Sequence, residues 1–523
     1  MKDCTVKKIR LRRNAVQIVL QIRNASDGLQ FFLKEATDEG VRVPLSGVRR
    51  GKTITLSFSP DQIPLSQGDW EVTAAESGSD AEEYLPLTAG IRRTLLMRGG
   101  SVSAGSGKLV AFPMAGDGER LMVRVRPATV YDTAAVWWKE RTAWALGLLL
   151  RRMGIGREAR VVFEKFCGQA QDNGFAYFTW CMKNLPESEK RHIYYVLDRR
   201  ASGWQTLKKE YGRQLTAFMS LRHMLLMMLS PLYIASESRT HGYLWQTRPN
   251  PLFRDIRNPR HRILFLQHGV TGLKRVDKVF GKKGYDPMTW FAVTSPKEQE
   301  IVMRNFGYSA EQAPVLGFAR WDMLEDRRDP ERPYILLMPT WRSWLERADE
   351  LSFRESEYYR VYNALLSNRE FLQMLREKGT ELLFYIHPKL ASMLGSFHQE
   401  KDTPVHLIPY GSRRLDELIM GCSALVTDYS SVCWDACYLS KPVIFFQFDA
   451  DRYLRVTGSY LDFETELPGP RAADGAALTE EIRKSAERCW QPDPESAARA
   501  ARMLPVRDRN NCARTEAFIK ETT

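Results

Sequence analysis

The sequence predicts an α/β protein in which two doubly wound domains follow a small all-β domain. Between residues 160 and 447, short apolar runs such as HIYYVL, ILFLQHG, YILLMPT and ALVTD alternate with segments of helical character. Near-continuous apolar strands separated by helices are typical of parallel sheets that are buried on both faces. The charged, proline-bearing stretch EDRRDPERP at residues 325–333 divides the strands into two sets. Two sets predict two doubly wound domains that face each other across a cleft.

A different pattern fills the first 130 residues. Short runs such as AVQIVLQI, TITLSF, WEVTAA and RLMVRVRP are separated by Gly, Ser, Asp and Pro turns, which predicts a small all-β sandwich or barrel. A chain of 523 residues is long enough for several domains of about 100–200 residues each. The predicted parts are an all-β sandwich-like domain at 1–130, an amphipathic linker helix at 131–157, a Rossmann-like domain at 158–328, and a second Rossmann-like domain with C-terminal helices at 329–523.

The segment DTAAVWWKERTAWALGLLLRRMGIG, residues 132–156, is a predicted helix with two interpretations. In the first, it is a linker helix that packs on the following domain. In the second, it lies in a membrane interface, with Trp137, Trp138 and Trp144 at the depth of the lipid headgroups and Arg151 and Arg152 on anionic lipid. The first interpretation is favoured, and the second stays open.

A membrane-spanning segment is not expected. The longest apolar stretch, LRHMLLMMLSPLYIAS at residues 221–236, is too short to cross a bilayer and contains Arg222, His223 and Pro231. The first residues, MKDCTVKKIRLRRN, are basic but lack the apolar core and cleavage site of a signal peptide. We therefore expect a protein that does not cross a membrane, and attachment to a membrane surface stays open.

The formal net charge of +13 and the pI near 9.3 indicate an anionic partner. Nucleic acid, an acidic membrane surface and a phosphorylated substrate each fit this charge. Nucleic acid is disfavoured as a partner because the basic residues are dispersed and the sequence has no RNP-like, KH-like or zinc-finger motif. The eight cysteines show no zinc-binding spacing, so neither a metal site nor a disulfide framework is expected, and reduced cytosol is the natural compartment.

Polar residues stand where several of the predicted strands end, which is where open α/β sheets bind their ligands. These residues are His268 and Gly269 after one strand, Thr340 and Arg342 after another, His387 after a third, and Asp428, Ser430 and Ser431 after a fourth. A helix that begins at one of the two serines would offer unpaired backbone N–H groups and hydroxyls to an anion. Together with two histidines and an arginine, such a helix start suits a diphosphate, whose transfer requires neutralisation of charge.

Five sequence blocks occur in an order that resembles one enzyme family. They are LQHGVTGLKRVD, VLGFARWDML, ILLMPTWR, YIHPK and LVTDYSSVCWDACYLSKPVIFFQFD. In this order they resemble the CDP-glycerol glycerophosphotransferases, which build poly(glycerol phosphate) chains and linkages of teichoic acids and related polymers. The resemblance runs from about Phe163 to near the C-terminus.

The resemblance implies a GT-B-like fold and a transfer reaction. Glycerol phosphate would pass from CDP-glycerol to an acceptor hydroxyl, and CMP would be released. The domain at 158–328 would take the acceptor, a membrane-linked or polymeric glycan or glycerol phosphate, and the domain at 329–523 would take CDP-glycerol. The family also implies peripheral attachment to the cytoplasmic face of the cell membrane, where the surface is anionic, and no metal or other cofactor.

The resemblance also assigns roles to residues at the matching positions. His268 resembles the general base on the acceptor hydroxyl. The grip on the diphosphate would come from His387, Arg342, Thr427, Ser430 and Ser431, and Arg320 and Asp322 would shape the cleft near the interdomain hinge. Further substrate contacts are expected from Gly269, Thr340, Lys389, Asp428 and Asp435.

Two departures and two alternatives accompany the resemblance. Tyr385 stands where many members have a lysine, and Lys389 is expected to substitute for it. The block HGVTGLKR differs from the more frequent HGTPLK form, which leaves the identity of the acceptor open. The alternatives are a GT-B glycosyltransferase that uses a sugar nucleotide and a ribitol-phosphate transferase. The role of the β domain at 1–130 stays open, with polymer or partner binding as its candidates.

Overall fold

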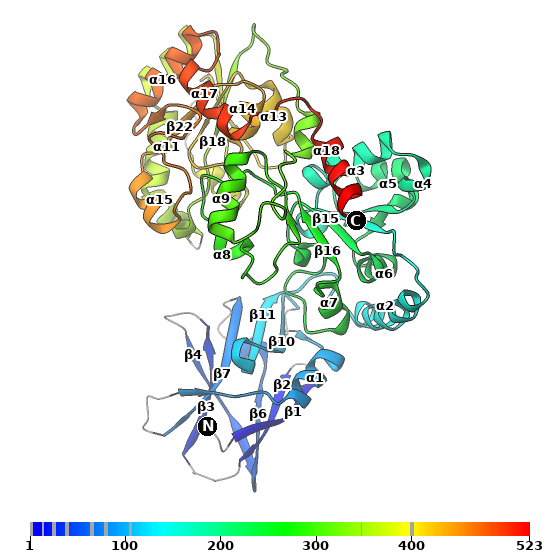
Figure 1. Cartoon of the computed structure of the whole chain (residues 1–523). Helices are drawn as coiled ribbons and strands as arrows, with labels where there is room; N and C mark the ends of the chain where they lie inside the picture. Colours follow the sequence, from blue (N-terminus) through cyan, green and yellow to red (C-terminus); the bar gives the residue numbers. More distant parts are fainter. Residues whose placement is uncertain are drawn as a thin grey trace. The chain divides into compact units, whose positions relative to one another are not determined.

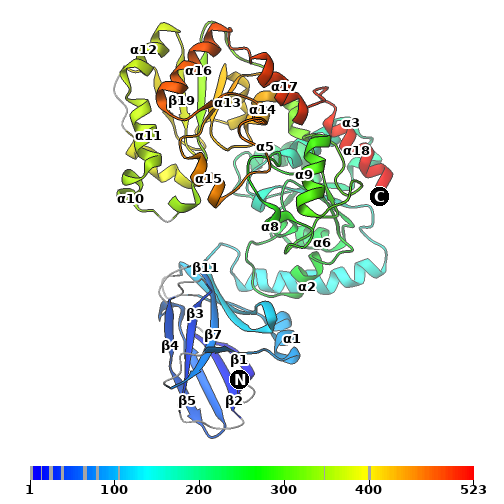
Figure 2. The same ribbon diagram turned by 60° about the vertical axis from the view of Figure 1, so that its left-hand side comes forward.

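The computed structural model describes residues 4–12, 15–22, 28–36, 41–62, 67–77, 82–103, 107–346, 348–397 and 402–523. The chain forms two compact units, and Figure 1 and Figure 2 show their elements. The first unit contains Met1–Gln169, Glu187–Tyr233 and Arg239–Arg262, and the second contains Ala170–Pro186, Ile234–Ser238 and Ile263–Thr523. The domain boundaries that the sequence suggests near residues 130, 157 and 328 stay predictions.

An antiparallel β-sandwich begins the first unit, as the alternating apolar pattern predicts. One sheet has the strand order β1-β2-β6-β5, and the other has the order β4-β3-β7-β11-β10-β9 with β8 paired to β7. Inward-facing side chains of both sheets, among them Ile18, Leu33 and Trp70, form one buried core. The elements are β1 (Cys4–Arg12), β2 (Ala15–Ile22), β3 (Leu29–Glu35), β4 (Arg42–Leu45), β5 (Gly47–Arg50), β6 (Thr53–Phe58), β7 (Gly68–Glu76), β8 (Glu82–Tyr84), α1 (Ala89–Arg98), β9 (Val102–Ser103), β10 (Leu109–Ala115) and β11 (Leu121–Pro127).

The predicted helix at residues 132–156 is present as α2 (Ala134–Arg152). One of its faces packs against α6 (Leu221–Leu229) and α7 (Pro251–Ile256) in the same unit. On this face the carboxylate of Glu140 is fully buried and forms an ion pair with Arg248 at 2.5 Å. Packing of this kind agrees with the linker interpretation of the helix. The membrane interpretation concerns the other face of α2, where side chains are exposed.

Two further sheets share one strand order, which confirms the predicted α/β architecture with Rossmann-type topology. They have the orders β14-β13-β12-β15-β16-β17 and β20-β19-β18-β21-β22-β23. In each sheet the first strand along the chain lies beside the second and the fourth, which is the doubly wound order. The pairs β12–β13, β13–β14 and β16–β17 are parallel, as are all pairs between β18 and β23. The strands are β12 (Arg160–Phe163), β13 (Ile193–Leu197), β14 (Leu215–Ala217), β15 (Leu232–Ala235), β16 (Arg262–Phe265), β17 (Trp290–Phe291), β18 (Tyr334–Met338), β19 (Glu381–Tyr385), β20 (Val405–Ile408), β21 (Ala424–Thr427), β22 (Val443–Phe446) and β23 (Arg471–Ala472).

The sheet from β18 to β23 is buried on both faces, which explains why its strands read as continuous apolar runs. On one face Leu337 and Val426 join a core with side chains of α11 (Glu357–Leu366), α12 (Arg369–Glu377) and α16 (Gly475–Glu487). The other helices are α3 (Asn173–Asn184), α4 (Glu187–Lys190), α5 (Trp204–Tyr211), α8 (Asp277–Phe280), α9 (Pro296–Phe306), α10 (Glu350–Glu355), α13 (Leu415–Gly421), α14 (Cys433–Tyr438), α15 (Ala450–Val456), α17 (Pro494–Met503) and α18 (Asn511–Thr522). Within the described parts of the chain, no helix combines the length and the apolar character that a bilayer crossing needs.

Candidate active site

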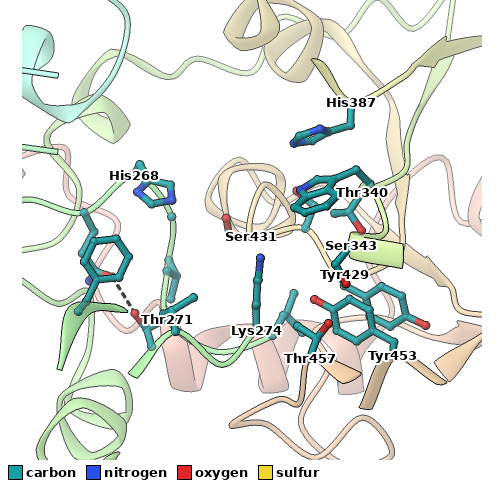
Figure 3. Close-up of a pocket in the computed structure, with 18 of the residues that line it drawn as sticks. His268, Thr271, Lys274, Thr340, Ser343, His387, Tyr429, Ser431, Tyr453 and Thr457 are labelled. Atoms are coloured by element: carbon teal, nitrogen blue, oxygen red, sulfur yellow. Dashed lines mark hydrogen bonds between the residues drawn. The ribbon is translucent and has the colours of Figure 1, made fainter. Parts of the chain in front are cut away.

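A pocket with a cavity volume of about 210 Å³ lies in the second unit, where strands β16, β18, β19 and β21 end. Figure 3 shows that His268 and His387 project into it from opposite sides, with Lys274 between them. Six of the residues selected from the sequence line this pocket: His268, Gly269, Thr340, His387, Ser430 and Ser431. The remaining ones do not line it: Arg320, Asp322, Arg342, Lys389, Thr427, Asp428 and Asp435.

The turn that carries His268 is fixed by a buried carboxylate. The side chain of Glu298, in the first turn of α9, accepts hydrogen bonds from the backbone N–H groups of Thr271 and Thr294, both at 2.6 Å. It accepts two more from the hydroxyl of Thr294 at 2.8 Å and from the amide nitrogen of Gln267 at 3.0 Å. An ionised carboxylate only accepts hydrogen bonds, so four donors match it. Burial raises the pKa of Glu298, and the four donors act in the opposite direction.

The same turn contains a strained backbone conformation. Gln267 has a φ of 59°, in the left-handed region that residues other than glycine rarely adopt. The side-chain amide of Asn173 donates hydrogen bonds to the carbonyl oxygens of Leu266 at 3.3 Å and Gln267 at 2.9 Å. In addition, the hydroxyl of Thr271 donates to the side-chain oxygen of Gln267 at 2.8 Å (Figure 3). Such conformations persist where the surroundings fix them, and they cluster at functional sites.

His268 itself has a half-exposed imidazole and a buried acidic neighbour. Its Nδ1 atom lies 3.6 Å from Oε1 of Glu237, whose side chain is only 6% exposed. A carboxylate next to one ring nitrogen can orient an imidazole and stabilise its protonated form, while the other nitrogen serves the pocket. Glu237 follows the strand β15, and the sequence analysis did not select it, although it stands at a strand end like the residues that were selected.

Gly269 allows two loops to approach more closely than any other residue would permit. A Cβ atom placed on Gly269 would lie 2.1 Å from the hydroxyl oxygen of Ser431, far inside van der Waals contact. The hydroxyl of Ser431 therefore occupies the space that a side chain at position 269 would need. The group that approaches position 269 is thus a side chain of the protein, and the substrate contact expected of Gly269 stays a prediction.

On the other side of the pocket, Arg342 joins the loops that follow β18, β21 and β22. Its guanidinium is fully buried, lies 2.8 Å from a carboxylate oxygen of Asp428, and binds Asp449 through two hydrogen bonds of 2.7 and 3.0 Å. It also donates to the carbonyl and hydroxyl oxygens of Thr340, both at 2.9 Å. Burial opposes the charge of Arg342, but Asp428 and Asp449 outweigh this effect and raise its pKa well above the usual value.

Asp428 and Thr427 also act within the protein. Asp428 accepts hydrogen bonds from the backbone N–H groups of Thr340 at 2.9 Å and Tyr429 at 2.6 Å. The hydroxyl of Thr427 donates to the carbonyl oxygen of Met338 at 2.6 Å. Both side chains are fully buried. This geometry gives no support to the diphosphate contacts that the resemblance implied for Arg342 and Thr427, or to the substrate contact expected of Asp428.

His387 is placed as a hydrogen-bond donor to the pocket. Its Nδ1 atom accepts a hydrogen bond of 3.2 Å from the backbone N–H of Lys389. In the neutral ring, the proton must then be on Nε2, which can donate to a ligand oxygen. The ammonium group of Lys389 binds Glu346 at 2.5 Å and lies 3.5 Å from the centre of the Trp341 ring. Lys389 therefore does not take the place in the pocket that the sequence suggested.

Lys274 lines the pocket, although the sequence analysis did not select it as a site residue. Its side chain extends from the loop after β16 toward the space between the two histidines (Figure 3). Its ammonium nitrogen lies 5.7 Å from the centre of the Trp341 ring. Lys274 is part of the block HGVTGLKR. The sequence feature that could have identified it is a cation six residues after His268, in a loop that follows a predicted strand.

Arg320, Asp322 and Asp435 connect elements of the second unit outside the pocket. Arg320 binds Asp435 at 2.9 Å and Asp172, the residue before α3, at 3.0 Å. Asp322 accepts hydrogen bonds from the backbone N–H groups of Asn511 at 3.0 Å and of the next residue at 2.8 Å, and so caps α18. These three side chains fix the arrangement of helices around the pocket and do not contact its interior.

The helix that follows the two serines starts later than predicted. Helix α14 begins at Cys433, whereas the sequence analysis placed its start at Ser430 or Ser431. The backbone N–H groups of Cys433 and Trp434 bond to the carbonyl oxygens of Ser430 and Ser431, three residues back, at 3.2 and 3.1 Å. These bonds form a tight turn before the α-helix. The serine hydroxyls thus belong to a turn at the edge of the pocket.

Comparison with known proteins identifies the family. The sequence profile of the family described as CDP-Glycerol:Poly(glycerophosphate) glycerophosphotransferase matches residues 149–521. The chain belongs to this family. The match includes every site residue described above and leaves the β-sandwich outside.

Two curated proteins from Bacillus subtilis (strain 168) are similar to this glycerophosphotransferase family member. The minor teichoic acid biosynthesis protein GgaB is 28% identical over 311 residues, which cover 57% of this chain and 32% of GgaB. A teichoic acid poly(glycerol phosphate) polymerase is 25% identical over 406 residues, which cover 72% of this chain and 50% of that protein. The matched region thus spans 32% to 50% of the length of these relatives.

The fold is also similar to a solved structure. The wall teichoic acid polymerase TagF superposes with a TM-score of 0.51 at 14% sequence identity, and the match covers 75% of this chain and 100% of that chain. A TagF variant soaked with CDPG gives a TM-score of 0.50. The likeness confirms the predicted GT-B-like fold of this glycerophosphotransferase family member.

Replacing Glu298 with Gln is expected to loosen the turn that carries His268. The amide would point N–H groups at the backbone donors of Thr271 or Thr294, and a buried donor without an acceptor lowers the free energy of unfolding by about 1–3 kcal/mol. Urea denaturation measures this loss, and hydrogen exchange at the amide of Thr271 reports the local loosening. Glu300→Gln, at an exposed position of the same helix, is the matched control. Equal exchange at Thr271 in both variants would contradict the role of Glu298.

Replacing Arg342 with Ala is expected to destabilise the second unit. Removing one member of a buried charge cluster leaves the carboxylates of Asp428 and Asp449 uncompensated, at a cost of about 3–5 kcal/mol in the free energy of unfolding. Arg354→Ala breaks an exposed ion pair with Glu350 and should cost less than about 1 kcal/mol. If Arg342→Ala keeps its stability and loses only affinity for the donor, Arg342 contacts the substrate directly.

Proposed function

We propose that this protein transfers glycerol phosphate from CDP-glycerol to an acceptor hydroxyl and releases CMP, in the synthesis of a teichoic-acid-like or other glycerol-phosphate-containing surface polymer. The observation that carries the proposal is one pocket into which His268, His387 and Lys274 all project, in a chain of the glycerophosphotransferase family. The names of the similar teichoic acid polymerases and the soaking of TagF with CDPG support it.

In the proposed reaction, His268 removes the proton from the acceptor hydroxyl. The freed oxygen attacks the phosphorus that carries the glycerol, and a new phosphodiester bond forms. The bond between that phosphorus and the oxygen of CMP breaks, and CMP takes the electron pair. Glu237, 3.6 Å from Nδ1 of His268, stabilises the positive charge that the imidazole gains. A positioned base contributes about 10²–10⁴-fold in rate to such a step.

The opposite wall of the pocket supplies neutralising groups for the diphosphate. His387 would donate from Nε2 to a phosphate oxygen, because its Nδ1 already accepts a hydrogen bond from the backbone of Lys389. Lys274 would place a positive charge between the two histidines, and the hydroxyls of Ser430 and Ser431 would donate to remaining oxygens. Transfer of a phosphoryl group depends mainly on positioning and on such charge stabilisation. The proposal includes no metal and no resident cofactor.

The choice of CDP-glycerol as the donor substrate can be tested by comparing three donors. Incubation with CDP-glycerol, CDP-ribitol and a UDP-sugar, each with a small polyol acceptor, should give CMP and an extended acceptor with CDP-glycerol above all. Mass analysis of the products distinguishes the three donors. Release of UDP from the sugar nucleotide would favour a glycosyltransferase, and greater turnover of CDP-ribitol would favour a ribitol-phosphate transferase.

Peripheral attachment to the cytoplasmic face of the membrane is part of the proposal. On α2 and just beyond it, Trp138, Leu149, Met153 and Ile155 are between 46% and 66% exposed, and Arg152 is exposed beside them. Exposed aromatic and aliphatic side chains with a flanking cation suit a bilayer interface. Trp137 and Arg151, which the sequence analysis also assigned to lipid, are engaged within the unit. Trp137 donates to the carbonyl oxygen of Gly99 at 2.9 Å, and Arg151 binds Asp255 at 2.7 Å.

Mutation of the two histidines is expected to affect transfer and donor binding differently. His268→Ala is expected to lower the rate of transfer by about 10²–10⁴-fold and to leave the affinity for CDP-glycerol nearly unchanged, because His268 acts on the acceptor. His387→Ala is expected to weaken the binding of CDP-glycerol as well as the rate. Rates are measured as CMP release, and affinity by calorimetry with CDP-glycerol alone. His406→Ala, on the partly buried edge strand β20 outside the pocket, is the control. If His268→Ala loses donor binding together with transfer, His268 is not the base.

Flotation with lipid vesicles tests the attachment. The wild-type protein should float with vesicles that contain anionic lipid, and less so at high salt. A variant with Trp138, Leu149 and Met153 changed to Ser should stay at the bottom of the gradient. The matched control changes Tyr285, Met323 and Leu351 to Ser, which are 69%, 51% and 68% exposed in the second unit. Equal flotation of the two variants would contradict the role of α2.

A further inference from the structure

The first sheet of the β-sandwich has an outward face that is polar and cationic. In β2 the side chains of Val16, Ile18 and Leu20 are buried, so the alternate positions face away from the sandwich core. The outward positions on the four strands of this sheet carry lysine and arginine along the edges and glutamine, threonine and serine in the centre. We call this set of residues the cationic sheet face: Lys8, Arg10, Arg12, Gln17, Gln21, Arg50, Thr53, Thr55 and Ser57.

The strand register brings these residues together in rows. Arg10 is paired with Gln17, which is paired with Ser57 on the next strand. In another row, Gln21 is paired with Thr53, and Thr53 with Arg50. The pairing of β1 with β2 shifts between Val6 and Lys8, so Lys7 is an inserted residue. The shift places Lys8, Arg10 and Arg12 on the outward side while Ile9 and Leu11 pack against the core.

The charge on this sheet is of one sign. The strands β1, β2, β5 and β6 contain no aspartate or glutamate. On the second sheet of the same sandwich, by contrast, cations are paired: Arg124 binds Asp69 at 2.6 Å and Arg120 binds Glu71 at 2.6 Å. Among the described residues, no ion pair joins a carboxylate to Lys8, Arg10 or Arg50. The positive charge of the cationic sheet face therefore has no carboxylate to compensate it in the described part of the chain.

The chemistry of the face selects among anionic partners. The outward positions carry no aromatic side chain on which a nucleic acid base could stack. They also lack the tryptophan, phenylalanine and leucine that insert into a bilayer interface, since their apolar members are small: Ala15, Val19 and Val48. Flat rows of cations and hydroxyl- or amide-bearing side chains match a chain that alternates phosphates with hydroxyl groups.

We propose that the cationic sheet face binds a linear polyol-phosphate chain, the polymeric acceptor or product of this enzyme, through its phosphates. The inference rests on the proposed function, because that function supplies the polymer. Lys8, Arg10 and Arg12 follow one another at every second residue of β1, which spaces them by about 7 Å along the strand. Cations in such a row can each meet one phosphate of an extended chain, and the central glutamine, threonine and serine side chains meet its hydroxyls.

Binding of this kind would raise the affinity of the enzyme for a polymeric acceptor and would not change the rate of the chemical step. A polymer held by the β-sandwich stays near the enzyme between transfers, so its free end is present at a raised effective concentration. A small polyol acceptor cannot benefit, because it carries no row of phosphates for the cations of the face to bind. The cationic sheet face should therefore lower the KM for a polymeric acceptor and leave transfer to a small polyol unchanged.

The test uses the full chain and a defined-length oligo(glycerol phosphate) as the probe. The face variant changes Lys8, Arg10, Arg12 and Arg50 to Gln. The matched variant changes four other exposed cations to Gln and so has the same net charge: Lys183, Lys209, Arg360 and Arg376. The loss of four exposed charge contacts is expected to raise the Kd of the face variant for the oligomer by about tenfold or more at low salt. The matched variant should bind like the wild type.

Activity and competing ligands complete the test. Both variants should release CMP at the wild-type rate with a small acceptor, and only the face variant should show a raised KM for the oligomeric acceptor. Equal affinity of the two variants for the oligomer overturns the proposal. Tighter binding of random duplex DNA or of phosphatidylglycerol vesicles through the same four residues also overturns it, in favour of nucleic acid or lipid. Absence of CMP release by the wild type would overturn the proposed function, whereas the binding measurement would still decide whether the face takes a polyol phosphate.

Discussion

The pocket depends on the ion pairs that Arg342 makes with Asp428 and Asp449. These three charges lie in the loops after β18, β21 and β22, and all three side chains are buried. Parallel strands end at one edge of a sheet, but nothing in the sheet itself fixes the loops that follow them. A buried guanidinium with several fixed donors can join three such loops, because each donor needs a specific partner. The positions of Thr340 and of the serines at the pocket edge follow from this arrangement.

The opposite side of the pocket uses the same principle with the signs reversed. There the carboxylate of Glu298 is buried, and it accepts hydrogen bonds from Gln267 and Thr271 of the loop after β16 and from Thr294, just before α9. A buried charge is costly unless every hydrogen-bonding position is satisfied, so a loop that satisfies it is confined to one conformation. Neither ion lines the pocket, yet each determines where a histidine or a hydroxyl stands. Fixed loops on both sides suit the proposed transfer reaction, in which positioning contributes much of the rate.

The sequence was sufficient for the fold and for part of the site. Apolar strands and their grouping into two sets follow from hydrophobic periodicity, and His268, Gly269 and His387 were found because ligands bind where parallel strands end. The same rule could not separate Arg342 and Asp428 from true pocket residues, since a polar side chain at a strand end can turn toward a neighbouring loop as well as toward a ligand. Glu237 follows a strand as well, but only the structure shows that its carboxylate lies next to His268. Lys274 was missed because it is a lysine in a basic stretch. The start of α14 was misplaced because a tight turn and a helix have the same serine-rich signature.

The contact between Gly269 and Ser431 makes these two positions dependent on each other. The space at position 269 is filled by a hydroxyl from position 431, at 2.1 Å from where a Cβ atom would be. Alanine at 269 therefore requires Ser431 to move or to be replaced by a smaller residue, and the effects of changes at the two positions on stability are expected to be non-additive. Natural relatives with a larger residue at the first position should have a compensating change at the second. Positions 269 and 431 on the two sides of the pocket are therefore expected to change together, although they are 162 residues apart in the chain.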